Sequence, residues 1–132
     1  MTESGSDAMH IGEVAERTGL SHRTIRHYEE VGLVTPSGRT VGGFRLYTDD
    51  DVERLLLIRR MKPLGFALEE MKQLLGVVDA LRNDPCDPTA RASVRDFIAE
   101  THQRRERLAR QLAMADEFRA LLTSLGDSDS PG

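Results

Sequence analysis

The stretch of sequence that decides the fold is IGEVAERTGLSHRTIRHYEEVGL, residues 11–33. Apolar residues that recur at spacings of three and four from Ile11 give a first short helix one apolar stripe. Gly19 follows this stripe and can take the positive φ that ends a helix. Ser21 is then a favourable N-cap for a second helix over residues 22–30. Two helices joined by a glycine-containing turn within about twenty residues are typical of a helix-turn-helix.

The second helix divides into an apolar and a basic face. Ile25 and Tyr28 can face the core, which leaves a basic face outside at spacings of three and four. This face consists of Arg23, Arg26 and His27. It suits the major groove of DNA, because guanidinium groups read guanine edges and helix N-termini bind phosphate. The alternative is a solvated helix of a protein-binding module, and the spacing alone does not decide between them.

A predicted hairpin favours DNA. Residues 35–38 interrupt the helix, and Gly42 with Gly43 supplies a tight two-residue turn. The following residues, 44–47, alternate strictly between apolar and polar or aromatic side chains, as a strand does. A basic hairpin after a helix-turn-helix is a wing, which can lie along the phosphate backbone. Arg39 and Arg45 are then phosphate contacts. In the alternative they only solubilise an exposed two-stranded sheet.

Two further helices follow the hairpin. Thr48 and Asp51 form a capping box, which explains the acidic run 49–51 as a first helical turn that complements the helix dipole. A divalent-ion site there would need additional ligands that the sequence does not offer. Pro63 ends this helix. The buried stripe of the next helix is expected to comprise Leu68, Met71, Leu75 and Val78.

A long helical stretch over residues 89–125 carries an apolar seam at steps of three and four. At about 1.5 Å per residue it is roughly 50 Å long, more than so small a domain can cover. The seam therefore predicts pairing with a second copy of the chain. The alternative is a helix folded back within one chain. The dimerisation residues we expect are Val94, Ile98, Leu108, Leu112, Phe118 and Leu122.

These patterns together predict a mostly α protein: a winged helix-turn-helix DNA-binding domain with a long C-terminal coiled-coil dimerisation helix. No internal repeat is evident in the sequence. The expected divisions are a disordered tail over 1–9, the DNA-binding domain over 10–81, a linker over 82–88, the dimerisation helix over 89–125 and a second disordered tail over 126–132.

Composition limits the function classes. The chain has 132 residues and a net charge of −4, which alone argues against nucleic acid. A nucleic-acid footprint is local, however, and residues 10–62 carry nine Lys and Arg against eight Asp and Glu. No apolar run approaches the roughly 20 residues that span a bilayer, and the N-terminus lacks the pattern of a secretory signal. We therefore expect a cytoplasmic protein.

The inventory of reactive residues argues against an enzyme. The four histidines have no Cys/His or Ser/His/Asp constellation beside them, and no glycine-rich phosphate loop is present. We expect no catalytic residue, no cofactor and no metal ligand. The remaining alternatives are a helix-turn-helix module that docks a protein partner, and a DNA-binding protein that needs no effector. Salt-dependent binding to promoter DNA would exclude the protein-docking module.

At the level of whole motifs, the sequence resembles the MerR (mercury-resistance regulator) family. The resemblance runs nearly continuously from Ile11 to Leu75. It is carried by residues 11–15, 24–33, 39–47 and 64–70. The resemblance implies a dimeric bacterial transcription regulator that binds double-stranded promoter DNA with an over-long spacer and pairs its long helices antiparallel. It also implies that effector binding twists the DNA, so that RNA polymerase can engage both promoter elements.

By position, the resemblance implies specific DNA contacts. It puts Arg23, Arg26 and Tyr28 of the second helix on DNA, Arg39, Phe44 and Arg45 in a first wing, and Lys62 in a second wing. Two positions depart from the family pattern. His27 stands where an aromatic residue is common, and Ala67 stands where a capping hydroxyl is common.

The effector is not evident from the sequence. Cys86, the single cysteine, precedes the long helix, where metal-sensing relatives place a thiolate ligand. Those relatives also carry cysteines beyond the far end of that helix, and residues 121–132 contain none. A site of two or more thiolates is therefore impossible within one chain. If Cys86 acts beyond packing, thiol oxidation is chemically easier than metal binding.

Overall fold

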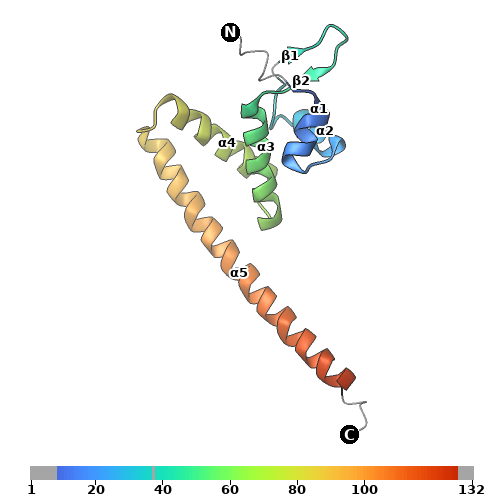
Figure 1. Ribbon diagram of the computed structural model, residues 1–132. Coiled ribbons are helices and arrows are strands. Elements are labelled where there is room, and N and C mark those ends of the chain that lie inside the picture. Colours follow the sequence, from blue (N-terminus) through green and yellow to red (C-terminus); the bar gives the residue numbers. More distant parts are fainter. Residues whose placement is uncertain (1–8, 37, 128–132) are drawn as a thin grey trace. The chain divides into compact units, whose positions relative to one another are not determined.

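A computed structural model describes residues 9–36 and 38–127, in two compact units that divide after Arg91. The first unit begins with the helices α1 (Ile11–Thr18) and α2 (His22–Glu30), followed by the strands β1 (Gly38–Arg39) and β2 (Arg45–Leu46). The helix α3 (Asp49–Met61), the 3-10 turn η2 (Lys62–Leu64) and the helix α4 (Leu68–Asn83) follow. The long helix α5 (Pro88–Asp127) begins at the end of the first unit, and its residues 92–127 make up the described part of the second unit (Figure 1). The mostly α winged helix-turn-helix that the sequence predicts is confirmed.

Local capping defines the helix-turn-helix as predicted. Gly19 has a φ of 73°, and its N–H donates to the Ala15 carbonyl at 2.8 Å, which ends α1. The Ser21 hydroxyl accepts from the Thr24 N–H at 3.0 Å, which begins α2. Thr18 stabilises the end of α1 from the buried side, because its hydroxyl donates to the Val14 carbonyl at 2.8 Å and the residue is fully buried.

The core of the first unit forms where α1, α2 and α3 meet. Val14 of α1, Ile25 of α2 and Leu55 and Ile58 of α3 are all fully buried. The predicted capping box begins α3: the Asp51 N–H donates to the Thr48 hydroxyl at 3.3 Å, and the Thr48 N–H donates to the Asp51 carboxylate at 2.9 Å. The packed face of α3 therefore fixes the two helices of the helix-turn-helix.

The wing turn differs from the prediction. The hairpin pairs Gly38 with Leu46 and Arg39 with Arg45, but its loop is not the two-residue Gly42–Gly43 turn expected. The Gly43 N–H donates to the Thr40 carbonyl at 2.9 Å and the Thr40 N–H donates to the Phe44 carbonyl at 2.8 Å, which encloses a three-residue loop. Within this loop Gly43 alone has a positive φ, 87°, as three-residue hairpins require at that position.

The expected N-terminal tail is one residue too long. Met9 is 2% exposed, and it pairs with Tyr47 through two backbone hydrogen bonds of 2.7 and 2.8 Å. It therefore forms an isolated antiparallel bridge with the residue just after β2 instead of belonging to the tail. A single apolar residue in a polar run gives no periodic signal, so the sequence pattern missed it. Residues 1–8 lie outside the described part of the chain.

The second half of the first unit also corrects two expectations. The buried residues of α4 are Met71, Leu75 and Val77, whereas Leu68 is 36% exposed because it opens the helix before a full turn exists. Val78, expected in the stripe, is half-buried.

The boundaries around α5 shift by a few residues from the expected linker over 82–88. The connection between α4 and α5 is shorter, residues 84–87, and the Asp87 carboxylate caps α5 by accepting from the Thr89 N–H at 3.0 Å. Pro88 suits the first position of the helix. At the far end α5 continues through Gly126 and Asp127, and residues 128–132 lie outside the described residues.

The helix α5 is 40 residues long, about 60 Å at 1.5 Å per residue. The predicted seam residues lie along it with much of their apolar surface open in the single chain: Ile98 is 62% exposed, Leu112 64% and Phe118 60%. Val94 is half-buried, and Leu108 and Leu122 are exposed. Such a row of exposed apolar side chains is unusual for a helix that remains unpaired.

We expect Leu55→Ala to lower the free energy of unfolding of the first unit by about 2–5 kcal/mol, because it opens a cavity in the fully buried core. Leu57→Ala, on the half-buried side of the same helix, is the control and should cost clearly less. Urea denaturation followed by circular dichroism measures both. Equal losses would contradict the assignment of Leu55 to the centre of the core.

Candidate nucleic-acid interface

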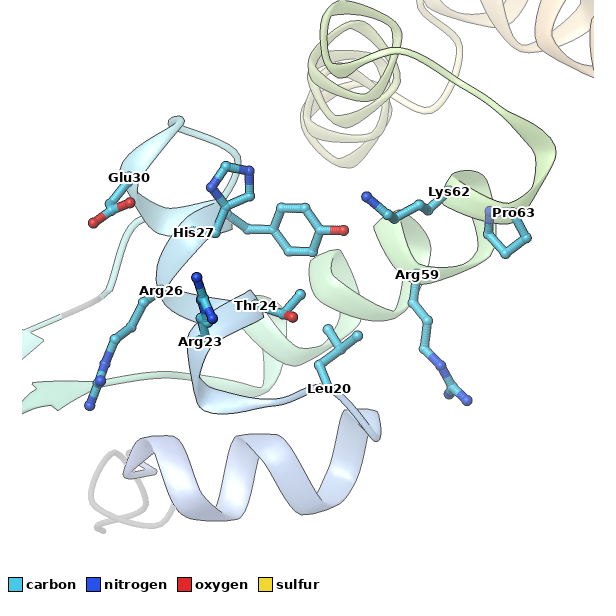
Figure 2. Close-up of a pocket in the computed structure, with 10 residues that line it drawn as sticks. Leu20, Arg23, Thr24, Arg26, His27, Glu30, Arg59, Lys62 and Pro63 are labelled. Atoms are coloured by element: carbon cyan, nitrogen blue, oxygen red, sulfur yellow. The ribbon is translucent and has the colours of Figure 1, made fainter.

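An open groove of about 1100 Å³ lies between α2 and the end of α3. Figure 2 shows the α2 side chains on one side of it and those of α3 and η2 on the other. The residues that line it are Leu20, Arg23, Thr24, Arg26, His27, Tyr28, Glu30, Arg59, Lys62 and Pro63. The structure thus brings Lys62, predicted for a second wing, to the same groove as the predicted basic face of α2.

The groove has a strong excess of positive charge. Four cations line it, Arg23, Arg26, Arg59 and Lys62, against the single acid Glu30. Within the part of the chain that the structure describes, none of these four cations forms an ion pair. A concave surface lined by one sign of charge concentrates the field and attracts a polyanion. The local charge therefore has the sign opposite to the net charge of −4.

The packing of α2 determines which of its side chains reach the groove. Ile25 is fully buried and Tyr28 is 4% exposed, whereas Arg23, Arg26 and His27 are exposed. The predicted division of α2 into two faces agrees with this burial. Tyr28 is among the residues that line the groove, and its ring lies 5.8 Å from that of His27, centroid to centroid. The structure therefore leaves Tyr28 little surface for the DNA contact that the family resemblance implies.

Arg59 is a groove residue that the sequence-based site did not include. It belongs to α3, and its guanidinium carbon lies 3.6 Å from where a Cβ on Gly19 would stand. It therefore covers the turn of the helix-turn-helix. The sequence held a signal that could have assigned Arg59 to the site: it lies three residues before Lys62, and residues three apart share a face of a helix. The packing of α3 against α1 and α2, which the sequence does not give, brings that face to the groove.

The wing presents apolar surface at its tip. Phe44, which the resemblance places in the DNA-contacting first wing, is 67% exposed, and Val41 within the three-residue loop is fully exposed. The backbone of Arg39 pairs with that of Arg45 across the hairpin. The side chain of Arg39 lies outside the described part of the structure, so its predicted phosphate contact stays a prediction.

Arg45, predicted as a phosphate contact, has an acidic partner within the protein. Its Nε donates to the Glu29 carboxylate of α2 at 2.5 Å, and this bond, with the nearby negative charge, raises the pKa of Arg45. The Tyr47 hydroxyl donates to the other Glu29 oxygen at 3.1 Å. Burial of the ring, then the charge of Glu29, raises the pKa of Tyr47 to about 12. Glu29 therefore joins α2, the recognition helix of the helix-turn-helix, to β2 and to Tyr47 just beyond it.

Cys86 lies in the connection between α4 and α5. It is exposed, and its N–H donates to the Asp84 carboxylate at 3.0 Å. Among residues 9–36 and 38–127, no three His, Cys, Asp or Glu side chains come close enough together to hold a metal ion. His102, on α5, has its Nε2 4.0 Å from the Glu106 carboxylate of the next helical turn. No helix in the described part of the chain is long and apolar enough to cross a membrane.

Comparison with known proteins gives consistent matches over most of the chain. A family model described as "MerR HTH family regulatory protein" matches residues 9–76, and a second, described as "MerR, DNA binding", matches residues 52–125. The HTH-type transcriptional regulator CueR of Yersinia pestis is 39% identical over 114 residues, which cover 83% of this chain and 80% of that protein.

A second relative and a solved structure are similar over different lengths. The mercuric resistance operon regulatory protein of Bacillus cereus is 49% identical over 69 residues, 52% of each chain, so this chain aligns with only about half of that relative. The crystal structure of a MerR family transcriptional regulator from Bacillus cereus has a TM-score of 0.60 at 32% identity, and the match covers 91% of this chain and 78% of that one.

The raised pKa of Tyr47, caused first by burial of its ring and then by the charge and hydrogen bond of Glu29, predicts a pH dependence of stability. A tyrosine whose pKa is raised in the folded state adds stability that is fully present below the unfolded pKa of about 10 and is lost as the pH rises through the folded pKa of about 12. We expect the free energy of unfolding to fall more steeply over this range in the wild type than in Tyr47→Phe. Urea denaturation at a series of pH values measures the slopes, and parallel slopes would contradict the prediction.

Proposed function

The chain belongs to the MerR family of DNA-binding transcription regulators, and from this premise we propose that it binds double-stranded promoter DNA as a homodimer. The observation that carries the proposal is the groove between α2 and α3, where four cations face a single acid and form no ion pair with any residue that the structure describes. Contact with the phosphate backbone of DNA requires an excess of positive charge on the protein, whereas the docking of a protein partner does not.

We divide the groove into base-reading and phosphate-binding parts. Arg23 and Arg26 project from the N-terminal part of α2, where guanidinium groups can enter the major groove and read guanine, and His27 lies beside them. Lys62 and Arg59 lie across the groove and suit phosphates on either side of the recognition helix. Arg39 and Phe44 of the wing extend the same contact along the backbone.

The second unit supplies the homodimer. The seam of α5 carries exposed Ile98, Leu108, Leu112, Phe118 and Leu122, on a series of three- and four-residue steps that also includes Thr101, Arg105 and Ala115. A second copy of the same helix is complementary to this seam. Burial of such a seam releases about 25 cal/mol for each Å² of apolar surface. A paired α5 would present two DNA-binding units to two half-sites of one operator.

Regulation follows from the dimer in this proposal. Two linked units that bind half-sites can bend and twist the intervening DNA, which brings an over-long promoter spacer into register for RNA polymerase. The residues required are those of the DNA groove and the α5 seam, so no catalytic step is involved. The protein acts where its DNA lies, in the cytoplasm.

The proposal is tested by in vitro selection from a random DNA library with the full chain, followed by footprinting on the enriched duplex. We expect enrichment of a sequence with two similar half-sites, and affinity that falls steeply as the salt concentration rises. Absence of any enriched sequence, with weak binding that does not depend on salt, would favour the helix-turn-helix protein-docking module instead.

Substitution of the groove cations should separate the two kinds of contact. Arg23→Ala and Arg26→Ala should each weaken binding to the enriched duplex by about 1–3 kcal/mol and leave binding to random DNA nearly unchanged. Lys62→Ala should weaken both alike and reduce the slope of log affinity against log salt by about one. Titrations on both duplexes measure this difference, and identical behaviour of all three variants would refute the division.

The dimer seam has a matched test on one helical turn. Leu108→Asp with Leu112→Asp should split the dimer and abolish operator binding, because charges at the seam cannot be buried unpaired. Gln111→Asp, beside the seam residue Leu112, is the control and should leave the dimer intact. Sedimentation velocity at micromolar concentration measures the mass. A wild-type monomer, or a dimer that survives both seam substitutions, would rule out α5 as the interface.

A further inference from the structure

The carboxylate of Glu29 connects the recognition helix to the wing, which we define as residues 38–46. Its two oxygens accept from two residues of one extended segment: Arg45 at 2.5 Å and Tyr47 at 3.1 Å. Residues two apart on a strand point to the same side, so both donors meet one carboxylate. The Glu29 side chain is only 14% exposed and the Tyr47 ring is fully buried. We call these three residues the wing clamp.

The wing has few other constraints on its orientation. In the described residues its strands are two residues each and pair at Gly38 with Leu46 and at Arg39 with Arg45, and Thr40 bonds Phe44 at the base of the loop. A two-stranded hairpin of this length is marginal alone in water. Beyond it, the Met9–Tyr47 backbone pair holds the segment that leads out of the wing. A bond from the recognition helix directly to the wing strand is therefore well placed to fix its angle.

The clamp is also close to the proposed base-reading residues. Glu29 follows Arg26 by three positions, so the two side chains are neighbours on the surface of α2. Arg26 lines the groove, and Glu29 holds the wing strand through Arg45. A rotation of the wing about α2 would therefore change where the wing meets DNA relative to Arg26.

We propose that Glu29 is a positioning residue for DNA recognition, which fixes the wing through Arg45 and Tyr47 so that wing and recognition helix meet the same DNA together. The inference rests on the proposed DNA-binding function and deepens it. It also reassigns Arg45, expected from the sequence as a phosphate contact, to a structural role that acts through Glu29.

The test compares two DNA duplexes: the one that the wild-type full chain enriches from a random library, and a random-sequence duplex of the same length. The variants are Glu29→Gln, Arg45→Gln and the two combined. Glu16→Gln is the matched control, because it removes the same charge from an exposed site on α1. Affinities are measured at several salt concentrations, and thermal unfolding reports whether each variant is folded.

We expect each single substitution to lower the ratio of specific to random affinity by about tenfold, and the combined variant to lower it no further, since both remove one interaction. The footprint of the enriched duplex should lose its wing-side protection in all three. Glu16→Gln should keep the wild-type ratio and footprint. Non-additivity is the readout that an independent phosphate contact of Arg45 would not produce.

Two outcomes would overturn the proposed role of Glu29. If Arg45→Gln weakens both duplexes alike and makes the salt dependence shallower by about one, while Glu29→Gln matches the wild type, Arg45 is a phosphate contact and the inference is wrong. If Glu29→Gln fails to fold, Tyr47→Phe removes one clamp bond and keeps the ring. A folded Tyr47→Phe protein with the wild-type ratio and footprint would then overturn the inference.

The test also distinguishes this inference from the proposed function. If the wild type enriches no sequence, the DNA-binding proposal itself fails before any variant is made. If enrichment succeeds and the clamp variants keep the wild-type ratio, only the role of Glu29 is refuted.

Discussion

The rotation of α2 about its own axis is the constraint on which the rest of the molecule depends. Ile25 is fully buried against the surrounding helices, and this fixes the rotation, because successive residues of a helix turn by a constant angle. Once Ile25 and Tyr28 face inward, Arg23 and Arg26 must face outward, and Glu29 must face the wing. One apolar contact therefore determines both the charge of the groove and the attachment of the hairpin.

Several arginines outside the groove differ from those that line it in having acidic partners among the described residues. Some of these partners lie on a different helix: Arg17 reaches Asp49 at 2.9 Å, and Arg54 reaches Asp79 at 2.7 Å. Such partly exposed pairs contribute little stability each. Their larger effect is on the field, since they neutralise cations away from α2. A chain with an acidic excess can therefore retain a cationic groove.

The features that the sequence predicted are those in which both partners are close along the chain. The caps at Gly19, Ser21 and Thr48 were predictable, because each hydrogen bond joins residues three or four positions apart. The exposed basic face of α2 followed from periodicity alone. The bridge from Met9 to Tyr47, the bond from Arg45 to Glu29 and the arrival of Arg59 at the groove join residues distant in sequence, and only the packed fold brings them together. Tyr28 shows the same limit. The family resemblance implies a DNA contact at its position, but it does not give the solvent exposure of the side chain, which is buried here.

The open apolar row of α5 has a consequence for gene dosage. If operator binding needs two chains, then below the dissociation constant of the pair the concentration of the active species rises as the square of the chain concentration. A doubling of synthesis would then raise it about fourfold, by mass action. Copy number in the cell, set by translation and proteolysis, would become part of the regulatory input. The regulator would thereby respond steeply to its own abundance.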